Sequence, residues 1–397
     1  MRLSLFFLLS FFSVLVSQSV YGQTDERQNN ASFEVPTPIV SLVTFGPGPE
    51  IWARFGHNAI RIQQGEYDAL YNFGYFDLNE PGFYKNYTLG NMQYYAVPEN
   101  TDDAYTWYQE LGRSIREQPL RLTPTQSHAV ANELARLVQP ETRRYPYDYF
   151  YNNCSTRVRD VLDAALGFPM RDATSEISAP HSMRWEALRM VQDDWLLYLG
   201  LHIALGQKVD QPISVYDQAF LPEHLADLFN EQQPENVIAD QSVFVAKEAA
   251  RQFLPRYYGL ALLGLMSSAF ILLPVFTKPN IWSMLPVRLW LTVSGLTGVL
   301  LMFLWVATHH EAAWNNANLL ILLPTNLLLL LMRYRFAERL AAHMIWVCIV
   351  LSILIKLLPN AQFNLDLMLW FVPAQLSTLL LWLRMKPNRR AQRLDSR

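Results

Sequence analysis

The chain has 397 residues, of which 51% are hydrophobic and 17% are charged, and its net charge is −3. This balance excludes an ordinary soluble enzyme, which is more polar, and a protein embedded throughout in a membrane, which is more apolar. The small negative charge provides no basic surface, so we expect no nucleic-acid partner. Charged and amide residues prevail before about residue 257 and Leu-rich runs after it, which predicts a polar domain followed by a membrane domain.

The first segment, residues 1–22, has the composition of a signal peptide. Arg2 forms a short positive region, residues 3–16 are apolar, and small or polar residues lead to Gly22, where we expect cleavage. No cysteine follows, so the segment is not a lipoprotein signal. If it were not cleaved it would be an N-terminal anchor, and in both cases the domain that follows is exported.

Residues 33–230 are predicted to form a domain of short strands and helices, and residues 231–257 a linker toward the membrane. Alternation in FGHNAIRI predicts a strand that carries His57. After the turn QQGEYD, the stretch ALYNFGYFDL predicts the next strand. If these two strands pair, Asn72 lies near His57, and Asp77 is the alternative neighbour.

The stretch YNNCSTRVRD carries Cys154 at the predicted start of a helix. Apolar residues recur at helical spacing after Cys154, and Asn152 or Asn153 is a suitable N-cap. Because the N-terminus of a helix favours anions, this position is expected to lower the pKa of a thiol. The N–H groups of the first turn could also hold an oxyanion, and Arg157 could contact a phosphate.

An unpaired cysteine in an exported domain is either a reactive thiol or a small buried hydrophobe. The other cysteine, Cys348, lies in an apolar stretch at membrane depth, so a disulfide is not expected. A nucleophilic cysteine needs a base, and the polar region offers His57, His128, His181, His202 and His224. His57 is favoured because a strand is a rigid platform; surface, loop or core positions are predicted for the others. Asn72 or Asp77 would orient the imidazole.

Five apolar segments are predicted to span the membrane, each needing about 20 residues: 258–276, 285–307, 318–332, 340–358 and 365–383. The third is short, and Pro324 is expected to kink it. Loops that carry Lys or Arg alternate with loops that have none, and the tail over 385–397 is strongly basic. The positive-inside rule therefore predicts a cytoplasmic tail and an exported N-terminal domain.

Several of these stretches resemble motifs of the Lnb-type lipoprotein N-acyltransferases of Bacteroidota. They are FGHNAIRI, YNFGYFDL, YNNCSTRVRD, LGLHIALGQKVD with AFLPEHL, and THHEAAWNNANLLILLP. The order of His before Cys, with Asn directly before Cys, is also similar to lecithin:retinol acyltransferase-like proteins. The resemblance implies an α+β papain-like (permuted NlpC-like) exported domain followed by an all-α five-helix transmembrane domain over 258–384. Asn72 stands where those relatives have a second histidine, which leaves its orienting role open.

The resemblance also implies a reaction. The Cys154 thiolate would attack an acyl ester of a membrane phospholipid, and His57 would move the protons. The acyl group would pass through a thioester to the N-terminal amine of a diacylglyceryl-modified lipoprotein, in the bacterial inner membrane, with no cofactor. No metal is implied, since no other cysteine or close pair of histidines is near. Candidate substrate-binding residues are Arg157, Asn153, His309, His310, Asn315 and Asn318. The last four lie in the outer loop between segments 285–307 and 318–332, and for them helix capping is the alternative.

Three other functions fit the same residues. A cell-wall amidase or peptidase could use the same Cys-His pair, although five helices are more than an anchor requires. A phospholipase or thioesterase would use water in place of the amine, and the sequence does not distinguish the two acceptors. A non-enzymatic envelope sensor or assembly factor would use Cys154 only as a structural residue.

Overall fold

The computed structural model describes residues 36–246, 256–277, 282–330 and 335–384. The predicted signal peptide and basic tail lie outside these residues. The strands are β1 (Ile39–Phe45), β2 (His57–Gln64), β3 (Tyr67–Tyr75), β4 (Gln93–Asn100), β5 (Ile115–Pro119), β6 (Arg144–Pro146) and β7 (Gln241–Phe244). The helices of the same part of the chain are α1 (Phe83–Leu89), α2 (Thr101–Glu110), α3 (Pro124–Leu137), α4 (Cys154–Leu166), α5 (Pro169–Thr174), α6 (Met183–Met190), α7 (Trp195–Ala204), α8 (Val215–Gln218) and α9 (Pro222–Gln232). The later helices are α10 (Tyr257–Phe276), α11 (Leu285–Ala307), α12 (Arg335–Leu354) and α13 (Leu365–Arg384).

The strands form one antiparallel sheet in the order β6-β4-β3-β2-β1-β5-β7. The predicted hairpin of β2 and β3 is present, and Gly65 at its turn has a φ of +60°. In this hairpin Ala59 pairs with Asn72. Because alternate residues of a strand share a face, His57 lies diagonally beside Asn72 on the same face of the sheet.

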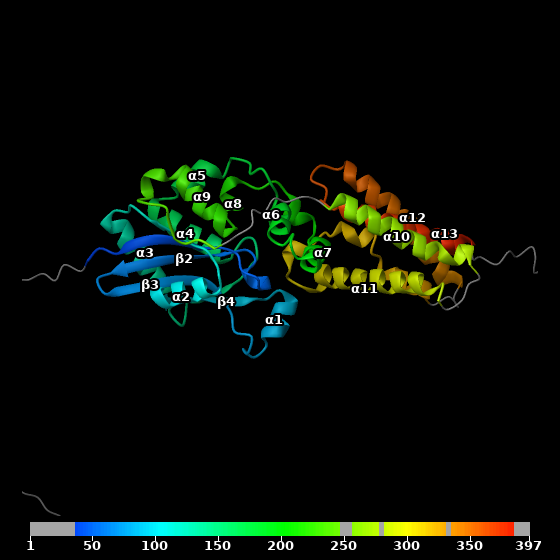
Figure 1. Ribbon diagram of the computed structural model, residues 1–397, viewed down its shortest axis with the longest axis horizontal. Coiled ribbons are helices and arrows are strands. Elements are labelled where there is room, and N and C mark those ends of the chain that lie inside the picture. The colour runs from blue at the N-terminus through cyan, green and yellow to red at the C-terminus, as the bar shows by residue number, and fades with distance from the viewer. Residues whose placement is uncertain (1–35, 247–255, 278–281, 331–334, 385–397) are drawn as a thin grey trace, which may run out of the picture. The chain divides into compact units, whose positions relative to one another are not determined.

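Helices cover both faces of the sheet (Figure 1). On one face, α3, α4 and α9 pack on apolar strand residues such as Leu42, Ile60 and Ile62. On the other face, α2 packs on a second cluster that includes Phe45 and Leu70. Burial of both faces explains why every residue of β1 from Val40 to Phe45 is buried. The sheet thereby becomes a fixed platform for residues at its strand ends.

The structure differs from the predicted linker over 231–257. Residues of β7 pair with β5, and Ile238 donates its N–H to the carbonyl of Pro119. Arg116 of β5 also forms an ion pair of 2.8 Å with Asp240. These partners are more than 100 residues away in sequence, so no local pattern could predict the pairing. The sheet therefore continues to Phe244, the last residue of β7.

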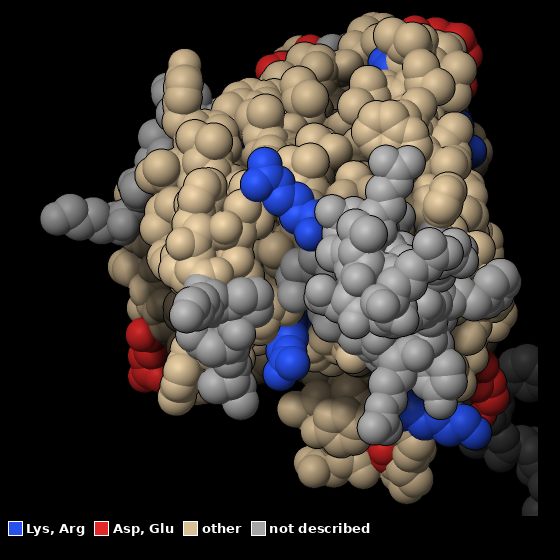
Figure 2. Space-filling view, turned by 90° about the vertical axis from the view of Figure 1, so that its right-hand side faces the viewer, with Lys and Arg blue, Asp and Glu red and all other residues tan. Residues whose placement is uncertain are grey.

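Among the described residues, α10, α11 and α13 are long and apolar enough to cross a membrane. They agree with the predicted segments 258–276, 285–307 and 365–383. A shorter apolar run, Ala342–Leu357, covers the later part of α12 and the 3-10 turn that follows it. Many large apolar side chains on these helices are exposed, for example Leu289 and Leu296 of α11. These exposed apolar side chains suit contact with lipid, but the expected count of five spanning helices is not confirmed. Figure 2 views the molecule from the right-hand end of Figure 1, where a few Lys, Arg, Asp and Glu side chains lie among uncharged residues.

The third predicted segment, 318–332, is not α-helical in its described part. It forms two 3-10 segments, η5 (Ala317–Leu320) and η6 (Pro324–Leu330). Pro324 has no N–H for a helix, and non-helical backbone needs partners at membrane depth. Helix α13 supplies one such partner, since the side chain of Gln375 donates to the carbonyl of Ile321. A hydrogen bond between the side chains of Asn326 and Ser294 also ties this segment to α11.

Helix α7 joins the sheet domain to the membrane helices. Its apolar residues, among them Leu199 and Ile203, pack against the cluster formed by α10 and α13. His202 of α7 hydrogen-bonds to Asp366 in the first turn of α13 at 2.8 Å, and both side chains are fully buried. Tyr198 donates to the second oxygen of the same carboxylate at 3.1 Å. The carboxylate is thus fully partnered inside an apolar contact.

Close packing of α10 on α13 gives a prediction for Gly264. A methyl group at Gly264 would lie 2.3 Å from the carbonyl oxygen of Leu369, whereas one at Gly259 of the same helix would meet nothing within 4 Å. Gly264→Ala should therefore destabilise the helical region by about 1–3 kcal/mol. Gly259→Ala should leave stability unchanged or slightly higher. Thermal unfolding of the full chain in detergent checks both, and equal melting temperatures for the two variants would refute the close packing.

Candidate active site

The side chain of Asn153 fixes the start of helix α4 and with it the position of Cys154. Its amide oxygen accepts hydrogen bonds from the backbone N–H groups of Ser155 and Thr156 at 2.9 and 3.0 Å. Its amide nitrogen donates to the carbonyls of Tyr149 and Phe220, both at 2.9 Å. Asn153 is therefore the N-cap that the sequence offered as one of two choices. These bonds occupy the amide, so the contacts support a capping role and not the predicted substrate-binding one.

A break in the sheet makes room for the thiol. Pairing of β2 with β3 ends at Ala59–Asn72, and β3 shifts its register between Asn72 and Tyr75. Gly74, in this irregular stretch, has a φ of +94°, and a methyl group there would lie 3.9 Å from the Cβ of Cys154. The backbone N–H of Asn58, just past the last pair, interacts with the Cys154 thiol. The predicted base, His57, directly precedes Asn58, so its backbone lies next to the N–H that meets the thiol.

Asn72 holds the imidazole of His57. The Nε2 of His57 lies 2.9 Å from the Oδ1 of Asn72, and that oxygen can only accept, so Nε2 carries the proton. The Nδ2 of Asn72 donates to Glu99 at 3.0 Å, which fixes the orientation of the amide. In the neutral ring this tautomer leaves Nδ1 as the base. The alternative residue, Asp77, instead accepts the N–H of Asn79 at 2.8 Å in the loop after β3.

Burial keeps both groups of the pair uncharged at neutral pH. The pKa of His57 is lowered to about 4, mainly by burial and also by the charge of Arg113. The hydrogen bond to Asn72 acts in the opposite direction but is outweighed. Burial also raises the pKa of Cys154, although three backbone N–H groups and the charge of Arg113 act in the opposite direction. The expectation that the helix N-terminus lowers the thiol pKa is therefore wrong in this structure, because desolvation of the thiolate outweighs the helix field.

Aromatic side chains surround the pair, and sequence patterns did not single out most of them. Tyr108 of α2 lies parallel to the His57 ring at a centroid distance of 6.5 Å, and the Arg113 guanidinium stands over Tyr108 at 4.6 Å. Tyr147 lies beside Gly74 and Cys154 in the core. Glu99 and Arg113 were also missed, since each reaches the site only through long-range packing. Only one feature of the sequence could have indicated that the N–H of Asn58 meets the thiol, namely its position directly after His57.

The remaining predicted binding residues lie in different surroundings. The guanidinium of Arg157 stacks over the ring of Tyr145 at 4.3 Å. His309 donates its N–H to the carbonyl of Leu89 at 2.8 Å, and the Nε2 of His310 donates to the carbonyl of Tyr87 at 2.9 Å. Both contacts bring the outer loop against α1 of the sheet domain.

Two asparagines of the outer loop have structural contacts. Asn318 is fully buried, donates to the carbonyl of Ile203 at the end of α7 and accepts from Asn364. Asn315 adopts a φ of +53°, and its carbonyl accepts the N–H of Gln207 at 3.4 Å. The alternative of capping and loop geometry therefore describes Asn318 and Asn315 better than substrate binding does.

One cluster among the described residues has the ligand types for a metal: Glu186, Glu223 and His224. Arg189 forms ion pairs with both carboxylates, and His224 lies 3.1 Å from Glu186. The arginine already neutralises much of the negative charge that would attract a cation. We assign no metal to this cluster.

Comparison with known families matches both parts of the chain. Residues 25–188 match the Lnb N-terminal periplasmic domain, and residues 247–360 match the Lnb transmembrane domain. The chain belongs to the Lnb family. These two matches make it a membrane protein with a periplasmic N-terminal domain. No curated protein and no solved structure matches the chain.

The raised thiol pKa predicts a steep pH dependence for alkylation of Cys154. Thiolate is the reactive form, and the ordinary thiol value of 9.0 is shifted upward here by burial. In a Cys348→Ser background, the rate of iodoacetamide labelling should rise about tenfold per pH unit from pH 7 to pH 9, without a plateau. A constant rate between pH 6 and pH 8 would mean that the thiolate is present at rest and would refute this prediction. Labelling is followed by mass spectrometry of the intact chain.

Proposed function

We propose that this Lnb-family protein is a cysteine-dependent N-acyltransferase. It takes an acyl chain from a membrane phospholipid and transfers it to the N-terminal amine of a diacylglyceryl-modified lipoprotein. The observation that carries the proposal is the break in the sheet where Cys154 meets Asn58, next to a histidine anchored by Asn72. The membrane helices of the same chain supply the reason for a lipid substrate.

The chemistry follows from the two neutral groups. The Nδ1 of His57 takes the proton of Cys154 as the sulfur attacks the ester carbonyl carbon of the phospholipid. The resulting oxyanion can accept the N–H of Asn58 and that of Cys154 itself, both of which lie by the sulfur. The ester C–O bond then breaks, His57 returns the proton to the departing lysophospholipid oxygen, and the acyl group remains on sulfur as a thioester.

The second half-reaction reverses these roles. The lipoprotein amine attacks the thioester carbon, and His57 accepts a proton from the nitrogen. The C–S bond breaks and the proton passes to sulfur, which restores the neutral pair. No ATP is required, since the overall reaction replaces an ester with an amide, which is the more stable bond.

The fold that we propose is the permuted NlpC-like form of the papain fold. In its support, a strand-borne histidine precedes a helix-borne cysteine in sequence, and an antiparallel sheet packs on the cysteine helix. We further propose that the protein lies in the bacterial inner membrane with its C-terminus in the cytoplasm, from the alternation of basic loops. Hydrolysis of the same thioester by water is the competing function.

The decisive test is mass spectrometry of a reporter lipoprotein from cells that lack their own N-acyltransferase. Expression of the chain should add one acyl mass to the N-terminal amine of the reporter, and Cys154→Ala should abolish it. Cys348→Ala is the matched control and should retain full transfer. Release of lysophospholipid and free fatty acid, without acylated reporter, would instead identify a lipase.

Asn72 is expected to position His57 during transfer. Asn72→Ala removes the acceptor of the Nε2 proton, so kcat should fall by about 10- to 100-fold, a part of what a general base contributes. The KM for phospholipid should stay within twofold, since Asn72 does not touch lipid in this mechanism. Asp77→Ala is the matched control and should keep its kcat. An equal loss in both variants, or a loss confined to KM, would contradict the positioning role.

A further inference from the structure

Several large apolar side chains of the periplasmic domain are exposed next to one another. Ile51 and Trp52 lie in the 3-10 turn η1 (Ile51–Ala53), Leu78 follows β3, and Tyr84 and Tyr87 belong to α1. All five are exposed, Trp52 by 67% and Tyr84 by 68%. Large apolar side chains that are exposed together indicate a surface that another apolar phase covers. We call these five residues the apolar patch.

Ring contacts join the apolar patch into one surface. Trp52 lies edge-on to Phe76 at a centroid distance of 6.5 Å, and Phe76 stacks on Phe83 at 5.7 Å. The ring of Phe83 in turn contacts those of Tyr84 and Tyr87 at 5.4 and 6.0 Å. The half-buried rings of Phe76 and Phe83 therefore connect the exposed rings from η1 and α1.

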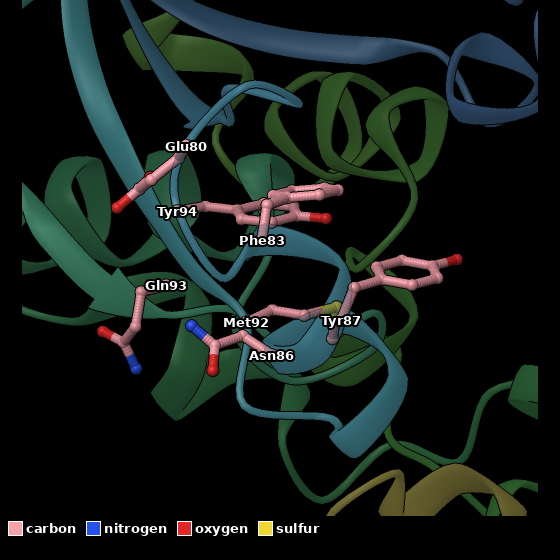
Figure 3. A pocket seen from close by; sticks show the side chains of 7 residues that line it. All are labelled: Glu80, Phe83, Asn86, Tyr87, Met92, Gln93 and Tyr94. Atoms are coloured by element: carbon pink, nitrogen blue, oxygen red, sulfur yellow. The ribbon is translucent and has the colours of Figure 1, made fainter.

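Charged side chains border the apolar patch. Glu80 is paired with Arg144 at 3.0 Å, and Asp77 accepts a backbone N–H of its own loop at 2.8 Å. In Figure 3, Glu80 and Tyr87 lie on opposite sides of the group of side chains drawn there. Lys85 of α1 is exposed, and its ammonium group suits the phosphates of lipids. Aromatic rings beside charges fit the headgroup layer of a bilayer, whereas the hydrocarbon core would exclude the charges.

Hydrogen bonds hold α1 at the end of the spanning helix α11. This helix has 23 residues and ends at Ala307. Its length of about 34 Å slightly exceeds a hydrocarbon core of about 30 Å, so its ends lie at the headgroup layers. His309 and His310 donate to the carbonyls of Leu89 and Tyr87 at 2.8 and 2.9 Å (Figure 1). Because three residues span at most about 10 Å, α1 lies close to the periplasmic headgroup layer.

The contact between α1 and the outer loop is close. Gly90 ends α1 with a φ of +76°, and a methyl group there would lie 2.7 Å from the backbone of His309. In the last turn of α11, Trp305 and Val306 are exposed. The exposed apolar surface of α11 therefore extends along the chain to the loop that holds α1.

We propose that the apolar patch rests in the periplasmic headgroup layer and thereby fixes the periplasmic domain on the membrane surface. Tryptophan and tyrosine are the residues that membrane proteins place at this level. The occupant is phospholipid and not a second protein, because a spanning helix ends beside the patch and lipid surrounds that helix. The lipid contact is independent of the reaction that the protein catalyses.

The lipid contact also has a use in acyl transfer, and this part of the inference rests on the proposed function. The turn η1 precedes His57, and Phe76 directly follows β3, which carries Asn72. The apolar patch thus lies on the loops that adjoin the catalytic strands. Since the ester bonds of a phospholipid lie at the boundary between headgroups and hydrocarbon, a domain held there needs to lift the donor only a short way.

Spin labelling tests the lipid contact without requiring turnover. In the full chain with Cys154→Ala and Cys348→Ala, a nitroxide is attached to Trp52→Cys or Tyr84→Cys, in vesicles of phosphatidylethanolamine and phosphatidylglycerol. Trp107→Cys is the matched control, since Trp107 of α2 is 59% exposed and lies outside the patch. Oxygen concentrates in lipid and a nickel chelate in water. The ratio of their collision rates with the nitroxide should be at least fivefold higher at positions 52 and 84 than at 107.

Each other outcome contradicts the proposal. Ratios at positions 52 and 84 that equal the ratio at 107 would place the patch in water. Low collision rates with both reagents at these positions would mean that protein covers the patch, which excludes lipid as the occupant. A high ratio at only one of the two positions would show that the patch is not one lipid-facing surface.

Acyl transfer is measured separately, in chains with intact Cys154. Trp52→Ser combined with Tyr84→Ser should raise the KM for bilayer phospholipid at least tenfold, and transfer from short-chain phospholipid in detergent micelles should stay within twofold. Trp107→Ser should change neither. An equal loss with both donors would contradict the role of the patch in transfer. Lipid-facing labels on a chain that transfers no acyl group would refute the transferase and leave the lipid contact standing, and transfer by a chain whose labels face water would do the reverse.

Discussion

A hydrogen bond between two buried side chains, His202 of α7 and Asp366 of α13, is the contact on which the arrangement of this protein depends. A carboxylate in apolar surroundings is stable only when its oxygens have partners, and here His202 and Tyr198 provide them. Beside this bond, Asn316 and Asn318 of the outer loop donate to the last carbonyls of α7. The outer loop is thus tied to the periplasmic domain at its far end, while its first residues hold α1.

The parts of the site that sequence could predict are those set by neighbours along the chain. Alternation placed His57 on a strand, and a short turn forced the next strand to pair with it, which brought Asn72 to the correct face. Helical spacing and an amide placed Cys154 at the first turn of α4. Long-range packing decided the rest. The burial that raises the thiol pKa, the pairing of β7 with β5, and the side chain of Glu99 behind Asn72 have no local signal.

An uncharged resting pair has a consequence for a lone cysteine in the periplasm. Thiolate is the form that oxidants and other disulfides attack, so a raised pKa protects Cys154 in an oxidising compartment. Protection is gained at the expense of nucleophilicity at rest. In the proposed reaction the sulfur gains its charge only as the proton passes to His57 and the ester carbonyl is in place. The three N–H groups beside the sulfur then stabilise charge that forms during the reaction.

The irregular backbone of residues 317–330 bears on how the protein is made. The carbonyl of Ile321 accepts from Gln375, which lies more than 50 residues later in the chain. Because the chain is synthesised from its N-terminus, Ile321 enters the membrane before Gln375 has been made. Until α13 is inserted, that segment cannot rest in hydrocarbon alone and must be kept against α11 or near water. Within the described chain, α13 is thus the helix that completes the hydrogen bonding of this irregular segment.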